Sequence, residues 1–106
     1  MLQQGDVVLN RVNLDISQAT KLRKDPRGIV LAEGEMTGHY HAIEDIEETD
    51  AELVQIGERM LLNVMADSVT LKHQEHKPVT IEKGIWEFGQ VVEKDWLNDM
   101  VRKVVD

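Results

Sequence analysis

Four histidines stand in two short spans of the chain, and these are the side chains best suited to chemistry. His39 and His41 are one residue apart, just after a glycine-rich stretch. Alternate side chains of an extended strand share a face, so these two imidazoles point the same way. A neutral imidazole is the commonest ligand for transition metals. The spacing therefore predicts that the pair coordinates one ion.

The second span supplies further candidate ligands. His73 and Glu75 share strand parity, whereas His76 can face the same point only through a bulge or turn, for which Pro78 is suited. Glu44 and Glu75 could add oxygen ligands. The predicted site for one divalent metal ion consists of His39, His41, His73, His76 and Glu75. The alternative is a polar network without metal, in which the histidines bond to carboxylates and backbone.

Size and charge limit the classes of function. A chain of 106 residues is long enough for one domain and too short for two. Its net charge of -8 repels phosphate backbones and anionic membranes, so neither nucleic acid nor membrane is an expected partner. The absence of cysteine excludes disulfides and thiolate ligands. Without a basic and apolar leader pattern or a long apolar run, the expected compartment is the cytoplasm.

Turn signals recur about every eight to twelve residues between short apolar runs. The runs expected to form strands are 7–12, 29–33, 40–46, 53–56, 59–65, 69–73, 79–81, 85–88 and 100–105. Gly57-Glu58 and Lys83-Gly84 each predict a tight hairpin. A short helix fits between Ile16 and Lys24, and the C-terminal run fits either a helix or the favoured closing strand.

These elements predict an all-β fold, a small barrel or sandwich that spans residues 1–106 as a single domain. Because His41 alternates with Ile43, and His73 continues the face of Val69 and Leu71, both histidine spans should look inward. The four imidazoles are therefore expected to converge in one mouth or lumen.

Several segments resemble a family of short bacterial and phage proteins. Its signature matches Gly34-Glu-Met-Thr-Gly-His-Tyr-His41 and His73-Gln-Glu-His76, with Gln4-Gly-Asp-Val7 and Lys83-Gly-Ile-Trp86 as further matching segments. This resemblance implies no particular activity. Gly34, His39, His41 and Glu44 or Asp45 also resemble the first metal motif of the cupins, which implies a cupin-like small barrel, although no histidine follows Lys83-Gly84 as the second cupin motif requires.

Two functional hypotheses follow. The first is a small cytoplasmic β protein that binds one divalent metal, with its catalytic residues, if any, left open. The second is a non-catalytic structural or interaction module, in a phage or multi-protein context, whose histidines serve folding. A homo-oligomer is compatible with both hypotheses, and neither identifies a small-molecule ligand or the metal.

Overall fold

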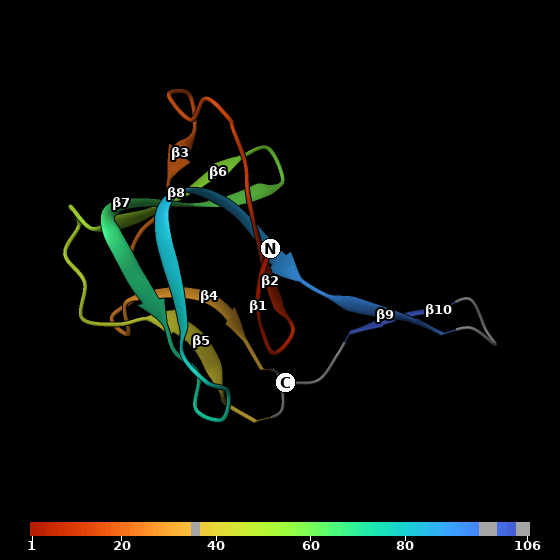
Figure 1. Cartoon of the computed structure of the whole chain (residues 1–106). Coiled ribbons are helices and arrows are strands. Elements are labelled where there is room, and N and C mark those ends of the chain that lie inside the picture. The colour runs from red at the N-terminus through yellow and green to blue at the C-terminus, as the bar shows by residue number, and fades with distance from the viewer. Residues whose placement is uncertain (35–36, 96–99, 104–106) are drawn as a thin grey trace.

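The computed structural model describes residues 1–34, 37–95 and 100–103, with side chains described up to residue 91 (Figure 1). Every regular element within these ranges is a strand, which confirms the all-β prediction. The strands are β1 Leu2–Gln4, β2 Val7–Arg11, β3 Thr20–Lys21, β4 Ile29–Glu33, β5 Tyr40–Ile43, β6 Ala51–Ile56, β7 Arg59–Leu71, β8 Val79–Gln90, β9 Val92–Asp95 and β10 Met100–Lys103. No helix long and apolar enough to cross a membrane occurs in this part of the chain.

Six strands form one sheet in the order β1-β2-β8-β7-β6-β3. The neighbouring strands of this sheet are all antiparallel. β4 pairs with β5, and β9 pairs with β10, as two separate antiparallel ribbons. Figure 1 shows the ribbon of β9 and β10 extending away from the other strands.

The apolar core joins the large sheet to the ribbon of β4 and β5. Ile29 and Ile43, which face each other across that ribbon, pack with buried side chains from the large sheet. The buried partners from the large sheet include Val7, Leu9, Leu62, Val64, Leu71, Ile81 and Trp86. Each fully buried aliphatic side chain contributes roughly 1.5–3 kcal/mol of transfer free energy. This two-layer core is consistent with the predicted small sandwich or barrel.

The hairpin predicted at Gly57-Glu58 is present, with Ile56 paired to Arg59 and a φ of 58° at Gly57. The hairpin predicted at Lys83-Gly84 is wrong, because β8 runs through it without a break. Gly84 has a φ of 145° and pairs with Val64 where the register of the ladder shifts. This glycine therefore lies at a β-bulge inside the paired strands and not in a hairpin turn.

The predicted end of one strand is also wrong. Separate strands are expected over 59–65 and 69–73, yet β7 runs through Asp67 and Ser68 to Leu71, with a shift of register between Val64 and Ser68. The carbonyl of Asp50 accepts hydrogen bonds from the amides of Met65 and Ala66, at 2.8 and 2.9 Å. The bulge therefore keeps its backbone satisfied without leaving the sheet.

The short helix fitted between Ile16 and Lys24 does not form. The amide of Ala19 bonds to the carbonyl of Ile16 in a turn, and Asp15 Oδ1 accepts the amide of Ser17. An aspartate that bonds to the backbone two residues ahead favours a turn over a helix. Of the C-terminal run, Met100–Lys103 is a strand, as favoured, but it pairs with β9 and does not close the large sheet, while residues 104 and 105 lie outside the described residues.

The turn before β4 contains an ion pair. Asp25 Oδ1 accepts hydrogen bonds from the amide and the Nε of Arg27, both at 2.9 Å. These two hydrogen bonds, the side-chain one first, lower the pKa of Asp25 from 3.8 to about 2. A carboxyl whose pKa is lower in the folded state stabilises the fold fully above its unfolded pKa, and this contribution is lost as the pH falls through the folded pKa.

We therefore expect the Asp25 carboxyl to titrate near pH 2 in a carbon-detected NMR titration. Arg27→Ala should return the midpoint towards 3.8, because it removes the side-chain donor. An unshifted midpoint in the unmodified protein would show that the pair is not formed in solution.

Candidate functional site

A pair of backbone hydrogen bonds brings the two histidine spans together. The amide of Ala42 donates to the carbonyl of Lys72 at 2.9 Å, and the amide of Lys72 donates back at 2.8 Å. The amide of Tyr40 also donates to Oε1 of Gln74 at 2.8 Å. These contacts hold β5, which contains His41, against the loop that follows β7 and contains His73 and His76.

The four imidazoles meet at this junction. The ring centroid of His73 lies 4.3 Å from that of His41, 4.6 Å from that of His76 and 5.4 Å from that of His39. The rings of His41 and His76 are nearly parallel, with centroids 6.1 Å apart. The structure thus brings together all four histidines that the sequence singled out.

His41 is the buried centre of this cluster, with 1% of its surface exposed. Its Nδ1 lies 2.9 Å from Oε1 of Gln4. The amide group of Gln4 is fixed in orientation, because its Nε2 donates to the carbonyls of Leu71 and Lys77, each at 2.9 Å. Gln4 therefore presents an acceptor to His41, and the ring proton lies on Nδ1.

Asp6 faces the opposite side of the same ring. Its Oδ1 lies 3.3 Å from Nε2 of His41, and both side chains are only 2% exposed. Oδ2 of Asp6 accepts a hydrogen bond from Nε2 of Gln90 at 3.0 Å. Among the described residues, Oδ1 has no hydrogen-bond partner. The carboxylate therefore points an unsatisfied oxygen towards the histidine cluster.

His73 has a different local role. Its Nδ1 accepts the amide of Glu75 at 3.0 Å and that of His76 at 3.3 Å. A nitrogen that accepts amide hydrogens carries no proton, so the proton of the neutral ring is on Nε2. This arrangement shapes the turn that carries His76 and makes His73 a hydrogen-bond donor towards its surroundings.

His39 and Glu75 form the outer edge of the cluster. Nδ1 of His39 lies 3.9 Å from Oε1 of Glu75, whose side chain is 67% exposed. Within the described ranges this buried Nδ1 also lacks a hydrogen-bond partner. Oγ1 of Thr37 accepts a hydrogen bond from the amide of His39 at 3.1 Å, which holds the turn before β5.

Sequence reasoning missed Gln4 and Asp6. Gln4 ends β1 and Asp6 lies in the turn that follows, far along the chain from the histidines, and a turn with polar residues is normally solvated. Their burial results from the contact of this turn with the loop after β7, which no local pattern reveals. As placed, the described side chains include no group of three or more His, Asp or Glu residues in a metal-binding arrangement.

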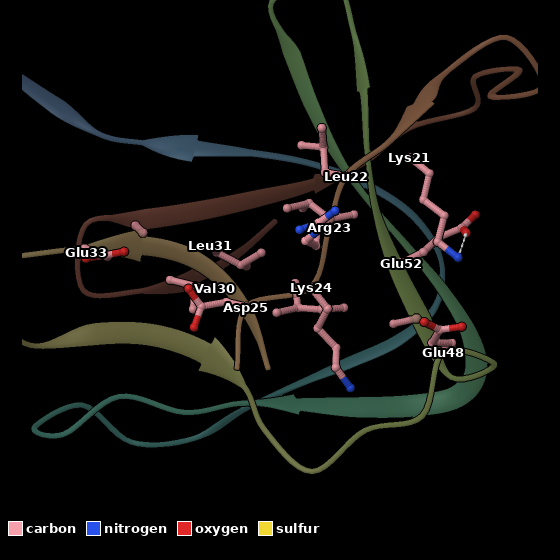
Figure 2. Close-up of a pocket in the computed structure, with 14 residues that line it drawn as sticks. Lys21, Leu22, Arg23, Lys24, Asp25, Val30, Leu31, Glu33, Glu48 and Glu52 are labelled. Carbon is pink, nitrogen blue, oxygen red and sulfur yellow. Dashed lines mark ion pairs between the residues drawn. The ribbon is translucent and has the colours of Figure 1, made fainter. Parts of the chain in front are cut away.

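A separate cavity of about 610 Å³ lies between β4, β6 and the segment that follows β3 (Figure 2). Ile29, Leu31 and Leu53 are among its apolar lining residues. Its charged lining includes both signs, and Lys21 pairs with Glu52 at 3.7 Å. No histidine lines this cavity, so it is distinct from the histidine cluster.

The fold and site define a small all-β domain in which a cluster of histidines surrounds the buried His41 and the buried carboxylate of Asp6. The chain matches, over residues 3–90, the family model described as "Domain of unknown function (DUF8820)", and it belongs to that family. Searches of curated proteins and of solved structures give no significant match. The resemblances to phage proteins and to cupins remain predictions.

Proposed function

We propose that this domain binds one divalent transition-metal ion at the junction of β5 and the loop after β7. The observation that carries the proposal is the convergence of four imidazoles, with ring centroids of neighbouring pairs 4.3–6.1 Å apart. Two imidazoles on one ion, each bonded at about 2.0–2.1 Å, have centroids roughly 5 Å apart. The spacing therefore suits a shared ion.

The hydrogen bonding of His41 supports the same proposal. A histidine that binds metal usually donates its other ring N–H to a carbonyl or carboxylate, which fixes the tautomer. Gln4 accepts from Nδ1 of His41 in this way, and Nε2 is the ring nitrogen that would bind the metal. His39 and His76 are only partly buried, so their rings can turn to complete a ligand set.

Imidazole ligands favour zinc, cobalt, nickel and copper over magnesium and calcium. An ion held by three protein ligands would keep a position for water or substrate, whereas four protein ligands would make the site structural. The cytoplasm, which keeps such ions at low free concentration, is the proposed compartment. A homo-oligomer of the domain is compatible with this proposal.

Thermal melting of untagged protein at pH 8, with added Zn²⁺ or with chelator, tests the proposal. A ligand at 100 times its dissociation constant adds about 2.7 kcal/mol of stability, which is a shift of roughly 10 °C or more for a domain of this size. The gain should shrink as the pH falls from 8 to 5, because protons compete with the metal for imidazole.

Two variants sharpen this test. His41→Asn retains a side-chain amide donor towards Gln4 but loses Nε2, so we expect it to fold and to lose most of the metal-induced gain. Glu58→Gln, at the exposed tip of the β6–β7 hairpin, is the control and should keep the full gain. Melting curves of the unmodified protein that ignore both metal and chelator at pH 8 would rule the proposal out.

The metal-free polar network is the second candidate function. It is favoured by a specific observation: both nitrogens of His41 already face protein groups, and Nδ1 of His73 accepts two backbone amides. In this reading the domain is a structural or interaction module, and the histidines order the loop after β7. It predicts stability that is independent of metal at every pH.

A further inference from the structure

The cavity between β4, β6 and the segment that follows β3 has the features of a second binding site. Its volume of about 610 Å³ lies within the range of roughly 300–1,000 Å³ that is usual for sites of small organic ligands. Leu31 and Leu53 line the cavity, pack against the core and remain partly exposed. An apolar group of a ligand would be stabilised here, because it would remove the exposed surface of these two leucines from water.

The charges around this cavity cancel each other. The charged residues that line it are Lys21, Arg23, Lys24, Asp25, Glu33, Glu48 and Glu52. Arg27 hydrogen-bonds to Asp25 and to Glu33 at 2.9–3.0 Å, so that positive and negative side chains are equal in number. The chain as a whole has a net charge of -8 and repels free anions. The cavity therefore favours a ligand that carries charges of both signs and is neutral in sum.

Arg23 and Glu48 are the two charged side chains available to such a ligand. Lys21 pairs with Glu52 at 3.7 Å, and Nζ of Lys24 donates to the carbonyl of Ile46 at 2.9 Å. Among the described residues, the side chains of Arg23 and Glu48 form no hydrogen bond and no ion pair, either with each other or with a neighbour. Figure 2 shows both at the cavity, Arg23 on the segment after β3 and Glu48 on the loop before β6.

We propose that this cavity binds a small zwitterion with an apolar side chain, which is the chemistry of an apolar α-amino acid or of a short apolar peptide with free termini. Arg23 binds the carboxylate, because a guanidinium matches the geometry of a carboxylate. Glu48 binds the ammonium group, and the apolar side chain of the ligand lies on Leu31 and Leu53. The proposal is independent of the metal site, since no histidine lines the cavity.

Titration with L-leucine and with L-leucyl-L-leucine, followed by the methyl resonances of Leu31 and Leu53, tests the proposal. Saturable shifts of these resonances with either compound are expected, and the tighter of the two gives the preferred length. The N-acetyl derivative of each compound lacks the ammonium group, and the carboxamide derivative lacks the carboxylate. Each derivative should bind about threefold to fivefold more weakly than its parent, which is the upper range for an ion pair open to solvent.

Two variants assign the two charges. Arg23→Gln should weaken binding of the parent compound by the same factor and leave binding of the carboxamide unchanged. Glu48→Gln should weaken binding of the parent and leave binding of the N-acetyl derivative unchanged. Lys83→Gln and Glu47→Gln are the matched controls outside the cavity and should bind all compounds normally. All four replaced side chains are exposed, so the variants should keep the melting temperature of the unmodified protein.

Three results would overturn the proposal. The first is an absence of shifts at Leu31 and Leu53 with both parent compounds at about 10 mM, which is ten times the roughly 1 mM dissociation constant of a weak complex. The second is an N-acetyl derivative that binds as tightly as its parent, because the cavity would then accept a simple apolar anion. The third is unchanged affinity for the parent compound in either Arg23→Gln or Glu48→Gln.

Discussion

Gly28→Ala should unfold most of the protein or cost about 3–5 kcal/mol of its stability. Gly28 has a φ of 110°, where an L-residue is strained, and a methyl group there would lie 2.1 Å from the carbonyl oxygen of Ile43. Strain at such a backbone position and overpacking each cost about 1–3 kcal/mol. The clash is with main chain, so no side chain can rotate to relieve it. Urea denaturation followed by tryptophan fluorescence measures the loss.

Gly57→Asn is the matched control for this variant. Gly57 also has a positive φ, of 58°, but nothing lies within 4 Å of a Cβ added there. Asparagine tolerates this left-handed region, so the cost should stay within about 1 kcal/mol. If both variants lost the same stability, the close approach of β4 to β5 at Ile43 would not be the cause.

Gln4→Leu should destabilise the protein by about 3 kcal/mol or more and should also loosen the histidine cluster. The side-chain amide of Gln4 is buried and bonds to His41 and to the carbonyls of Leu71 and Lys77. Leucine of similar size would orphan these three partners, and each buried orphan costs about 1–3 kcal/mol. Chemical denaturation reports the stability, and the imidazole nitrogen resonances report the disordered cluster.

Gln3→Leu is the control for the change of side chain. Gln3 is exposed, and its Nε2 bonds only locally, to the carbonyl of Gly5 at 3.0 Å. Its replacement should therefore change stability by no more than about 0.5 kcal/mol. Imidazole resonances and stability that remain unchanged in Gln4→Leu would show that the amide of Gln4 does not hold the loop after β7.

Much of the fold could be predicted because strand formation is encoded locally. Alternating apolar residues and β-branched runs identified β2, β4, β5, β6 and most of β7 and β8. The errors concerned glycine and polar residues inside strands. Gly84 and Asp67 look like turn residues in the sequence, yet tertiary pairing between β7 and β8 turns them into parts of a bulge. Whether such a residue ends a strand depends on the partner strand, which local sequence does not specify.

The histidines of the candidate site were found by the same local logic, because His41 and His73 continue apolar strand faces. Their partners were not, since Gln4 and Asp6 reach the cluster through a contact between residues more than sixty positions apart. The sequence by itself thus determined the all-β class, the residue types available to hold a cation and the inward direction of His41. Only the tertiary structure decided that Asp6 would face His41 with an unsatisfied oxygen while Glu75 stayed in solvent. Burial distinguishes these two carboxylates, and burial is a property of the packed chain and not of its local sequence.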